Sequence, residues 1–411
     1  MRARNRLLTS CVSLCVAIPF ATPALAQQTD RPASVLDLVA QEYQPIGIRL
    51  GNIRIDPELD ARIEYDSNIY AEATDKDDDW KTVISPRLTG TYDAGTVKMT
   101  ARAAGTFRRF FSFKRENSSA GLADLKLGWQ PNEGTSIQGT GGWERAIEDR
   151  GDPEARNFQT IGPRRIDVLH GTLNVAHEMG RLGFDAEAAA RRLDHVSSID
   201  AERDHAVYSG SARLRYRLSG LVSIFGQGFV NRRDFRLATD TSGINRDATT
   251  YGGRGGVAID PGGTLRGDFG VGVFRFDPSD PTLKGRTGLS VEGSMTFQPT
   301  QRIAFTLDAF QGDVATLRAG AIARTDSRLQ IGMQSEARHN LRWSLAAFYR
   351  RTNFVGTPVK ERTIGGLFEA EYLINRLFSV AATVRYGDRS SDDPTESYTR
   401  LRGGVELRVR F

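Results

Sequence analysis

Residues 401–411 alternate between apolar and polar side chains and end on an aromatic residue, Phe411. Successive side chains of a β-strand point to opposite faces, so Leu401, Leu407 and Phe411 fall on one face. Arg400, Arg402, Arg408 and Arg410 fall on the other. A face with four arginines cannot be buried in a dry core. The alternation therefore predicts a strand with lipid on one side and a wet interior on the other.

The same alternation recurs from residue 57 onward, about every 20 residues, with links that are short and long in turn. The short links carry Gly, Pro and Asn, as tight hairpins require. The pattern predicts an all-β fold, a transmembrane antiparallel up-and-down β-barrel of about 18 strands. An even count places both termini in the periplasm. The predicted strands span residues 58–65, 82–92, 96–107, 120–129, 136–146, 166–177, 182–192, 206–218, 221–231, 249–259, 264–276, 287–297, 302–311, 324–337, 341–351, 363–372, 377–386 and 398–411.

The first part of the chain has the pattern of a secretory leader, followed by a short segment before the barrel that we call the head. Arg2, Arg4 and Arg6 precede a short apolar stretch, and residues 24–26 form an A-x-A cleavage site. We therefore predict three parts: a signal peptide at 1–26, a periplasmic N-terminal segment at 27–56 and an outer-membrane barrel at 57–411. Within the head, residues 33–42 have apolar positions at helical spacing, and residues 45–56 are extended.

Composition narrows the class of protein. Removing the leader takes away three arginines and no acids, so the formal net charge falls from +5 to +2, which excludes nucleic-acid binding by charge. Both cysteines lie in the leader, which leaves the mature chain without a thiol or disulfide. The mean hydropathy of −0.39 is typical of a barrel, whose strands are only half apolar.

Basic residues on the predicted lumen face are the main candidates for function. Acidic residues interleave with them along the same face. One interpretation is a ladder of salt bridges that stiffens a wide barrel, and the other is an arginine track that conducts an anionic solute. The candidate lumen-lining residues are Arg102, Arg191, Arg213, Arg215, Arg217, Arg402, Arg408 and Arg410. Aromatic residues near strand ends, Tyr398 among them, predict the girdles of a membrane barrel.

Signals for catalysis are weak, and we predict no enzyme, no catalytic residue, no cofactor and no metal site. His195 and His205 flank one long link that also contains Asp200 and Asp204. This cluster could bind a cation or act as a hydrolase dyad, but solvated loop residues are the usual outcome. The glycine-rich run at 252–256 is no phosphate loop, because no helix follows it, and it fits a place where strands approach or bend.

The start of the predicted barrel resembles a known family. Residues 45–51 read PIGIRLG, and residues 65–70 read YDSNIY. Both resemble motifs of the putative outer-membrane β-barrel porin family associated with proteobacterial exopolysaccharide and capsule gene clusters. The resemblance implies an outer-membrane component of polysaccharide export and supplies no catalytic residue.

These observations lead to one expected function and two alternatives. We expect a passive outer-membrane conduit for acidic exopolysaccharide, because a charged polymer needs a wet lumen with weak, repeated contacts. A general diffusion porin for small solutes and a plugged structural or surface-binding barrel are the alternatives. The expected partners are outer-membrane lipids, lipopolysaccharide, the barrel assembly machinery and periplasmic polysaccharide-export proteins. Phe411 is the expected assembly signal, because a terminal aromatic residue resembles what that machinery recognises.

Overall fold

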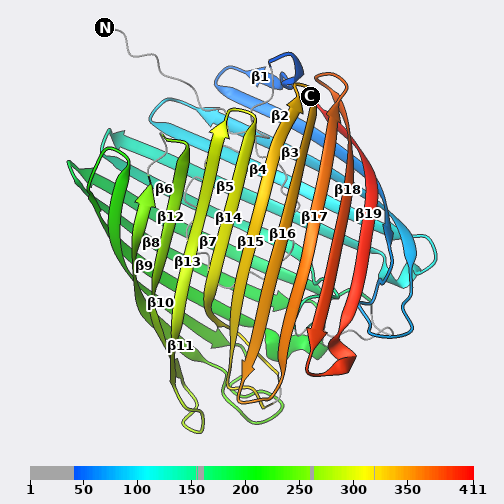
Figure 1. Cartoon of the computed structure of the whole chain (residues 1–411), viewed down its shortest axis with the longest axis vertical. Coiled ribbons are helices and arrows are strands. Elements are labelled where there is room, and N and C mark those ends of the chain that lie inside the picture. The colour runs from blue at the N-terminus through cyan, green and yellow to red at the C-terminus, as the bar shows by residue number, and fades with distance from the viewer. Residues whose placement is uncertain (1–40, 154, 156–161, 260–262, 319) are drawn as a thin grey trace.

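The computed structural model describes residues 41–153, 155, 162–259, 263–318 and 320–411. Nearly all of them lie in one antiparallel sheet, in which each strand pairs with the next along the chain (Figure 1). The barrel strands are β2 (Ile53–Asp66), β3 (Asp79–Asp93), β4 (Val97–Phe110), β5 (Ser118–Asn132), β6 (Thr135–Ile147), β7 (Arg165–Met179), β8 (Leu182–His195), β9 (His205–Arg217), β10 (Val222–Phe235), β11 (Ala248–Ile259), β12 (Leu265–Pro278), β13 (Arg286–Thr300), β14 (Ile303–Val314), β15 (Ala323–Arg338), β16 (Leu341–Val355), β17 (Lys360–Leu373), β18 (Phe378–Ser391) and β19 (Tyr398–Arg410).

The sheet closes on itself where the last strand meets the first barrel strand. β19 pairs with β2 from Arg402 opposite Asp66 to Arg410 opposite Glu58. Closure leaves the barrel strands β2–β19 without an open edge, so each of them pairs on both sides within the sheet, as a hydrocarbon environment demands. The 18 strands from β2 to β19 confirm the predicted fold class.

The outer surface of the barrel is apolar. Leu59 and Ile63 on β2, and Val405 and Leu407 on β19, are all exposed and all project from the same side of the sheet. Charged residues alternate with them on the side that faces the lumen. Most of the predicted girdle residues, such as Trp129 and Tyr372, are likewise exposed on the outside.

Tyr398 corrects the girdle prediction. Its hydroxyl donates to the backbone oxygen of Gly151 at 3.1 Å, inside the barrel. It has the same parity along β19 as Arg400 and Arg402, so it shares their inward face. Being near the end of a strand was therefore not enough to place it at the lipid interface.

The two ends of the barrel differ. One end carries the short hairpin links, and Gly95 and Gly180 adopt the left-handed conformation there, with φ of 79° and 62°. The C-terminus and the short strand β1 (Ile48–Leu50), which forms a hairpin with the start of β2, lie at this same end (Figure 1). The other end carries the long connections, with 3-10 turns η3 (Lys114–Glu116), η4 (Ser198–Arg203) and η5 (Pro394–Glu396).

The predicted signal peptide and most of the predicted helix at 33–42 lie outside the described residues. Of that helix, only Gln41 and Glu42 are described, in a 3-10 turn, η2 (Gln41–Tyr43). Among the described residues, no helix has the length and apolar character needed to span a membrane.

Candidate functional site

The lumen face is defined by its alternation with the exposed apolar side chains. All eight candidate arginines lie on this face, and most contact an acid. Arg213 contacts Asp268 at 3.0 Å, while Arg215 and Arg217 both contact Glu178 at 3.0 Å. Arg191 lies on β8 opposite His170 on β7. The remaining contacts are Arg102 to Asp124 at 2.6 Å, Arg402 to Asp149 at 2.9 Å, Arg408 to Glu369 at 2.8 Å and Arg410 to Glu371 at 3.2 Å.

Where β19 meets β2, ion pairs form two adjacent groups that we together call the seam network, one of Arg87 with Glu58 and Asp60 and a larger one of the other members. Arg408 is buried and forms ion pairs with Glu369, Glu371 and Glu406. Glu371 also pairs with Arg342 and Arg410, and Glu406 also pairs with Arg62. A buried charge is costly unless it is paired, so the members depend on one another. The seam network consists of Glu58, Asp60, Arg62, Glu64, Asp66, Lys81, Arg87, Arg342, Glu369, Glu371, Arg400, Glu406, Arg408 and Arg410.

On β9–β15 the arginines lie over inward-facing phenyl rings, and we call this surface the aromatic wall. The Arg213 guanidinium carbon lies 4.0 Å from the centre of the Phe225 ring, and that of Arg254 lies 4.5 Å from the centre of Phe229. Such contacts contribute about 0.5–2 kcal/mol each. The aromatic wall consists of Arg213, Arg254, Arg286 and Arg328 over Phe225, Phe229, Phe274 and Phe310.

Glycines give the rings of the aromatic wall their space. A Cβ atom on Gly256 would lie 2.5 Å from Cζ of Phe225, and one on Gly252 would lie 2.7 Å from Cζ of Phe229. Both glycines also come close to the backbone of β12. The glycine-rich run lies within β11, in agreement with the predicted role in close strand approach, and it also accommodates the rings.

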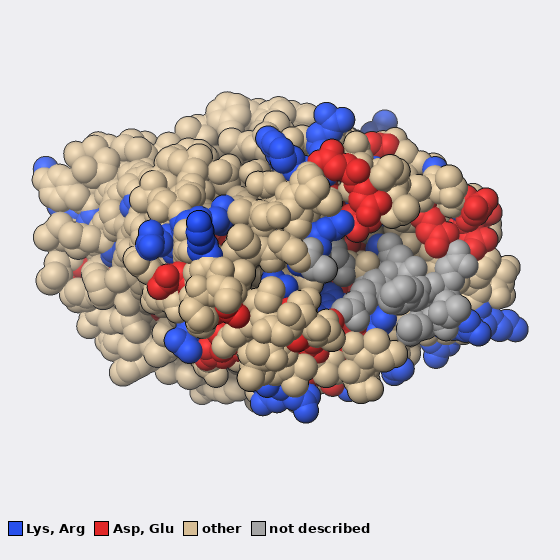
Figure 2. Space-filling model, turned by 90° about the horizontal axis from the view of Figure 1, so that it is seen from below, with Lys and Arg blue, Asp and Glu red and all other residues tan. Residues whose placement is uncertain are grey.

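The long connections fold inward over one end of the barrel. Figure 2 views this end, which has an oval outline and carries basic and acidic side chains in mixed groups. Tyr70 on the β2–β3 connection packs edge-on against Phe113, and its ring also lies under Arg150 of the β6–β7 connection. Arg150 in turn contacts Glu116 at 2.7 Å.

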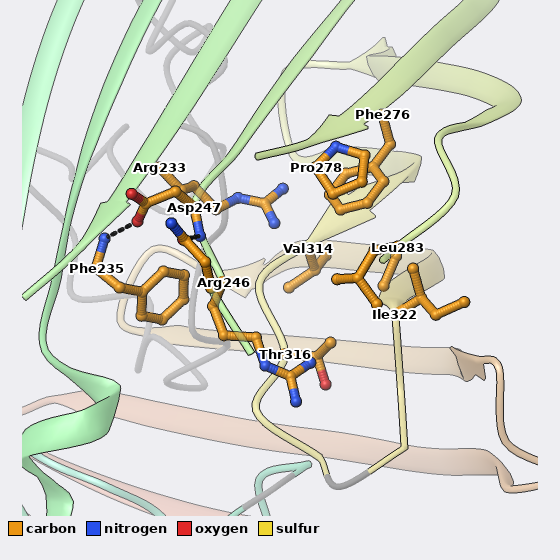
Figure 3. A pocket seen from close by; sticks show the side chains of 12 residues that line it. Arg233, Phe235, Arg246, Asp247, Phe276, Pro278, Leu283, Val314, Thr316 and Ile322 are labelled. Atoms are coloured by element: carbon orange, nitrogen blue, oxygen red, sulfur yellow. Dashed lines mark hydrogen bonds between the residues drawn. The ribbon is translucent and has the colours of Figure 1, made fainter. Parts of the chain in front are cut away.

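A recess among the β10–β11, β12–β13 and β14–β15 connections is a packing feature rather than a site (Figure 3). The Phe235 backbone N–H donates to Asp247 at 2.6 Å, and Arg246 extends past the Phe235 ring to the backbone oxygen of Ala321, also at 2.6 Å. Beneath them Phe274 and Phe276 form a small buried core with Ala248 and Ala323. These contacts hold the connections to the mouth of the barrel.

Residues 149–152 of the β6–β7 connection reach the lumen face of β18 and β19. Asp149 contacts both Arg400 and Arg402 at 2.9 Å, and the Gly151 oxygen accepts from Arg389 and Tyr398. Burial raises the pKa of Asp149, but Arg402 and Arg400 outweigh burial and hold the pKa well below its usual value. Burial, together with the nearby Asp149 carboxylate, raises the pKa of Asp152 to about 7.

The histidine cluster is structural in its contacts. His195 Nδ1 lies 3.0 Å from Asp204, whose other oxygen contacts Arg236 at 3.1 Å, and Asp200 pairs with Arg164. Asp200 and Asp204 are buried, so the expectation of solvated loop residues is wrong for them. Within the described ranges, no three His, Asp or Glu side chains are placed to hold a metal ion.

Several lumen-face residues escaped the sequence analysis. Arg254 and Arg350 alternate along their strands in step with other inward-facing residues, so periodicity alone could have identified them. Arg254 lies inside the glycine-rich run, which was interpreted only as a place of close strand approach. Asp149 and Arg150 lie on a long connection, which has no repeating pattern from which the direction of a side chain could be predicted. Only the folded position of the connection reveals them.

Phe411 directly follows β19. Its side chain is half exposed, and its backbone N–H donates to the Pro57 oxygen at 3.1 Å. The terminal residue thus sits at the joint between the last and first barrel strands. Its role as an assembly signal stays a prediction.

Comparisons with known proteins place the chain in a family. The model of the family described as "Putative beta-barrel porin 2" matches residues 41–411. No curated protein matches. Among solved structures, Pseudomonas aeruginosa OprD is 11% identical, with 91% of this chain and 98% of that chain covered and a TM-score of 0.43. P. aeruginosa OpdK is 13% identical, with 87% and 99% covered and a TM-score of 0.44.

The siderophore receptor PirA of Acinetobacter baumannii is 7% identical, with 89% of this chain and 81% of that chain covered and a TM-score of 0.42. Likenesses this distant carry no argument about cargo. The family match, the closed barrel and its apolar outer face lead to one conclusion: the chain belongs to the putative beta-barrel porin 2 family and is a porin-like β-barrel of the outer membrane.

Proposed function

We propose that this barrel is a passive conduit for an acidic exopolysaccharide. The observation that carries the proposal is that arginines line the lumen face from the short-turn end, at Arg217, to the long-connection end, at Arg400. Guanidinium groups suit carboxylates, and a series of partly exposed ones gives weak contacts that a moving polymer can make and leave. Fixed acids beside most of these arginines keep each contact weak.

Arg215 and Arg217 are the best residues for a test. Their side chains are 23% and 38% exposed, and both share Glu178 near the short-turn end. Arg213 is different, because it is buried against Phe225 and Asp268, so a change there would disturb the fold as well as the charge. A double variant, Arg215→Gln with Arg217→Gln, removes two positive charges while leaving the apolar outer face intact.

The purified protein would be inserted into planar bilayers, and the reversal potential would be measured in a KCl gradient. We expect an anion preference that the double variant weakens, because local charge at a pore mouth sets the concentration of small ions there. Arg192→Gln is the matched control. Arg192 has 63% side-chain exposure on the outer face, so the same change should leave the reversal potential unaltered.

Secreted acidic polysaccharide would be assayed in the strain that carries each variant. Two results together would rule the conduit out: the wild-type channel shows no anion preference, and export of the polysaccharide does not depend on the protein. The contacts of residues 149–152 with the wall support a second candidate, a barrel closed by its own connections. Absence of conductance in bilayers would favour that candidate.

A further inference from the structure

A second recess lies between residues 149–152 of the β6–β7 connection and the lumen face of β16–β19. Its free volume is about 60 Å³, which is room for about four water molecules or for one carboxylate group. Its lining is strongly basic, with two acids, Asp149 and Asp152, against five arginines. Those arginines are Arg350, Arg385, Arg389, Arg400 and Arg402.

Four of the five arginines have partners. Arg350 contacts Asp326 at 2.7 Å, Arg389 donates to the Gly151 oxygen, and Arg400 and Arg402 hold Asp149. Nε of Arg350 and Nε of Arg389 are also buried without a hydrogen-bond partner. Arg385 differs, because it has a buried, unpartnered Nη2 and makes no hydrogen bond or ion pair at all with the described residues. A buried guanidinium nitrogen without an acceptor is costly, and it points to an acceptor that the protein itself does not supply.

The neighbours of Arg385 increase this cost. It lies directly opposite Arg402 on β19 and opposite Leu367 on β17. Like charges at facing positions of adjacent strands repel each other, and no acid faces Arg385 on either neighbouring strand. The charges of Asp149 and Glu64 act on Arg385, but neither carboxylate forms an ion pair with it. Arg408 by contrast has three carboxylates in contact, so Arg385 is a local departure from the rest of this wall.

Asp149 shows which chemistry this wall accepts. One of its oxygens contacts Arg400 and the other contacts Arg402, each at 2.9 Å. A planar carboxylate is therefore already bound by two arginines of the recess. Phe348 and Thr363 also line the recess and supply an aromatic ring and a hydroxyl, groups that suit the apolar faces and hydroxyls of a sugar ring.

We propose that this recess binds the carboxylate of an acidic sugar unit, with Arg385 as its main cationic contact, and that Asp149 is an internal carboxylate that the ligand displaces from Arg402. The site rests on the proposed function and gives it a place on the wall. Binding loosens the hold of residues 149–152 on β19, so entry of an acidic chain weakens the contacts that narrow its path.

Isothermal titration calorimetry on the full-length protein in detergent tests the site, with trigalacturonate as the probe and neutral maltotriose as its control. We expect trigalacturonate to bind and maltotriose not to bind. Arg385→Gln should weaken binding about 10- to 100-fold, because charge-assisted hydrogen bonds to the carboxylate are lost. Asp149→Asn should tighten binding about 3- to 10-fold, because a competitor for Arg402 is removed.

Arg192→Gln on the outer face should bind like the wild type. Heat-dependent mobility on gels would show that each variant is folded, and Arg385→Lys, which keeps the charge but loses the planar fork, gives a second measure if Arg385→Gln fails to fold. We expect an intermediate loss for it.

The proposal is overturned if trigalacturonate does not bind the wild type, if maltotriose binds equally well, or if loss of Arg385 leaves the affinity unchanged. These results are separate from those that test the conduit. A channel can show anion preference and support export while this recess is empty, and the recess can bind trigalacturonate in a barrel that does not conduct.

Discussion

Arg408 at the seam and Arg213 on the aromatic wall are both buried arginines on the lumen face, yet their surroundings differ. Arg408 lies 2.8 Å from Glu369 and 3.3 Å from Glu371, with Glu406 also in contact. Arg213 has one carboxylate, Asp268, and its guanidinium carbon lies 4.0 Å from the centre of the Phe225 ring. The seam holds arginine by charge alone, whereas the aromatic wall holds it by charge and by shape.

This difference determines which kind of substitution destabilises each wall. The seam network contains several buried carboxylates, so loss of one cation leaves more than one anion without a partner. The aromatic wall depends on the space that Gly252 and Gly256 leave for the rings, so it is sensitive to a single added methyl group. A charge change should therefore damage the seam more, and a volume change should damage the aromatic wall more.

The largest effect is expected at the end of β19, the strand that completes the seam. Phe411→Asp should remove the assembly signal and leave little folded barrel in the outer membrane. The charge itself costs less than about 2–4 kcal/mol, because the residue lies near an end of its strand and that cost applies to the bilayer midplane. Gel mobility with and without heating measures the folded fraction, and wild-type levels of the folded form would contradict this expectation.

The next largest effect separates the two walls. Arg408→Met should lower the free energy of unfolding by about 3–5 kcal/mol, because three carboxylates lose their shared cation. Arg213→Met should cost less, about 1–3 kcal/mol, because it leaves one carboxylate, Asp268, that is more exposed.

Urea unfolding in lipid vesicles, followed by tryptophan fluorescence, measures both variants. Equal losses would mean that the seam network is no more interdependent than the aromatic wall. Adding Glu406→Gln to the Arg408→Met variant should recover part of its loss.

A smaller effect tests the role of shape. Gly256→Ala should cost about 1–3 kcal/mol, because the added Cβ would overlap the Phe225 ring and the backbone of β12. Gly255→Ala is the matched control on the opposite face of the same strand, where the nearest atom to a new Cβ is 3.9 Å away, and it should change stability by less than about 0.5 kcal/mol. Similar costs for both would remove the steric argument.

The smallest effect concerns pH at residues 149–152, which lie beside the seam. Asp152, whose folded pKa is about 7, binds its proton more tightly here than in a released segment, where its pKa would be ordinary. Its contribution to the contact is therefore complete at low pH and is lost as pH rises from about 4 through 7. Asp149 and Glu148 raise this pKa, while Arg350 and Arg389 lower it.

Asp149 does not change its charge between pH 5 and 8, so it does not alter this loss of stability with rising pH. Its pKa lies well below the usual value, so it stays ionised throughout that window. Hydrogen exchange at residues 149–152 should be faster at pH 8 than at pH 5, after correction for the intrinsic rate. Asp152→Asn should abolish the difference, and an unchanged difference in that variant would assign the effect to another group.

The strands were predictable because their signal is local. Period-two alternation marks which side chains share a face, and that is why all 18 strands and the inward direction of residues such as Arg213 and Arg408 follow from the sequence. The pairing of those residues was not predictable in the same way. Glu369 meets Arg408 because β17 and β19 pair with opposite edges of β18, and the register of both pairs brings the two side chains together on the lumen face.

The long connections were the least predictable part. Asp149 lies on a segment with no repeating pattern, and its contact with Arg402 depends on the curvature of the barrel. For Tyr398 two sequence signals disagreed. Its parity with Arg400 indicates an inward side chain, which is correct, whereas its place near a strand end suggested an outward one, which is wrong. The missing partner of Arg385 depends on every neighbouring side chain at once, so only the folded structure reveals it.

The contact between Asp149 and β19 also has a consequence for the order of folding. Asp149 is separated from Arg400 by 251 residues and from Arg402 by 253. Such distant pairings form late, because a long stretch of chain must first be ordered. The segment at 149–152 can be secured only after the last strand is in place, so the long-connection end of a nascent barrel stays open until β19 has formed.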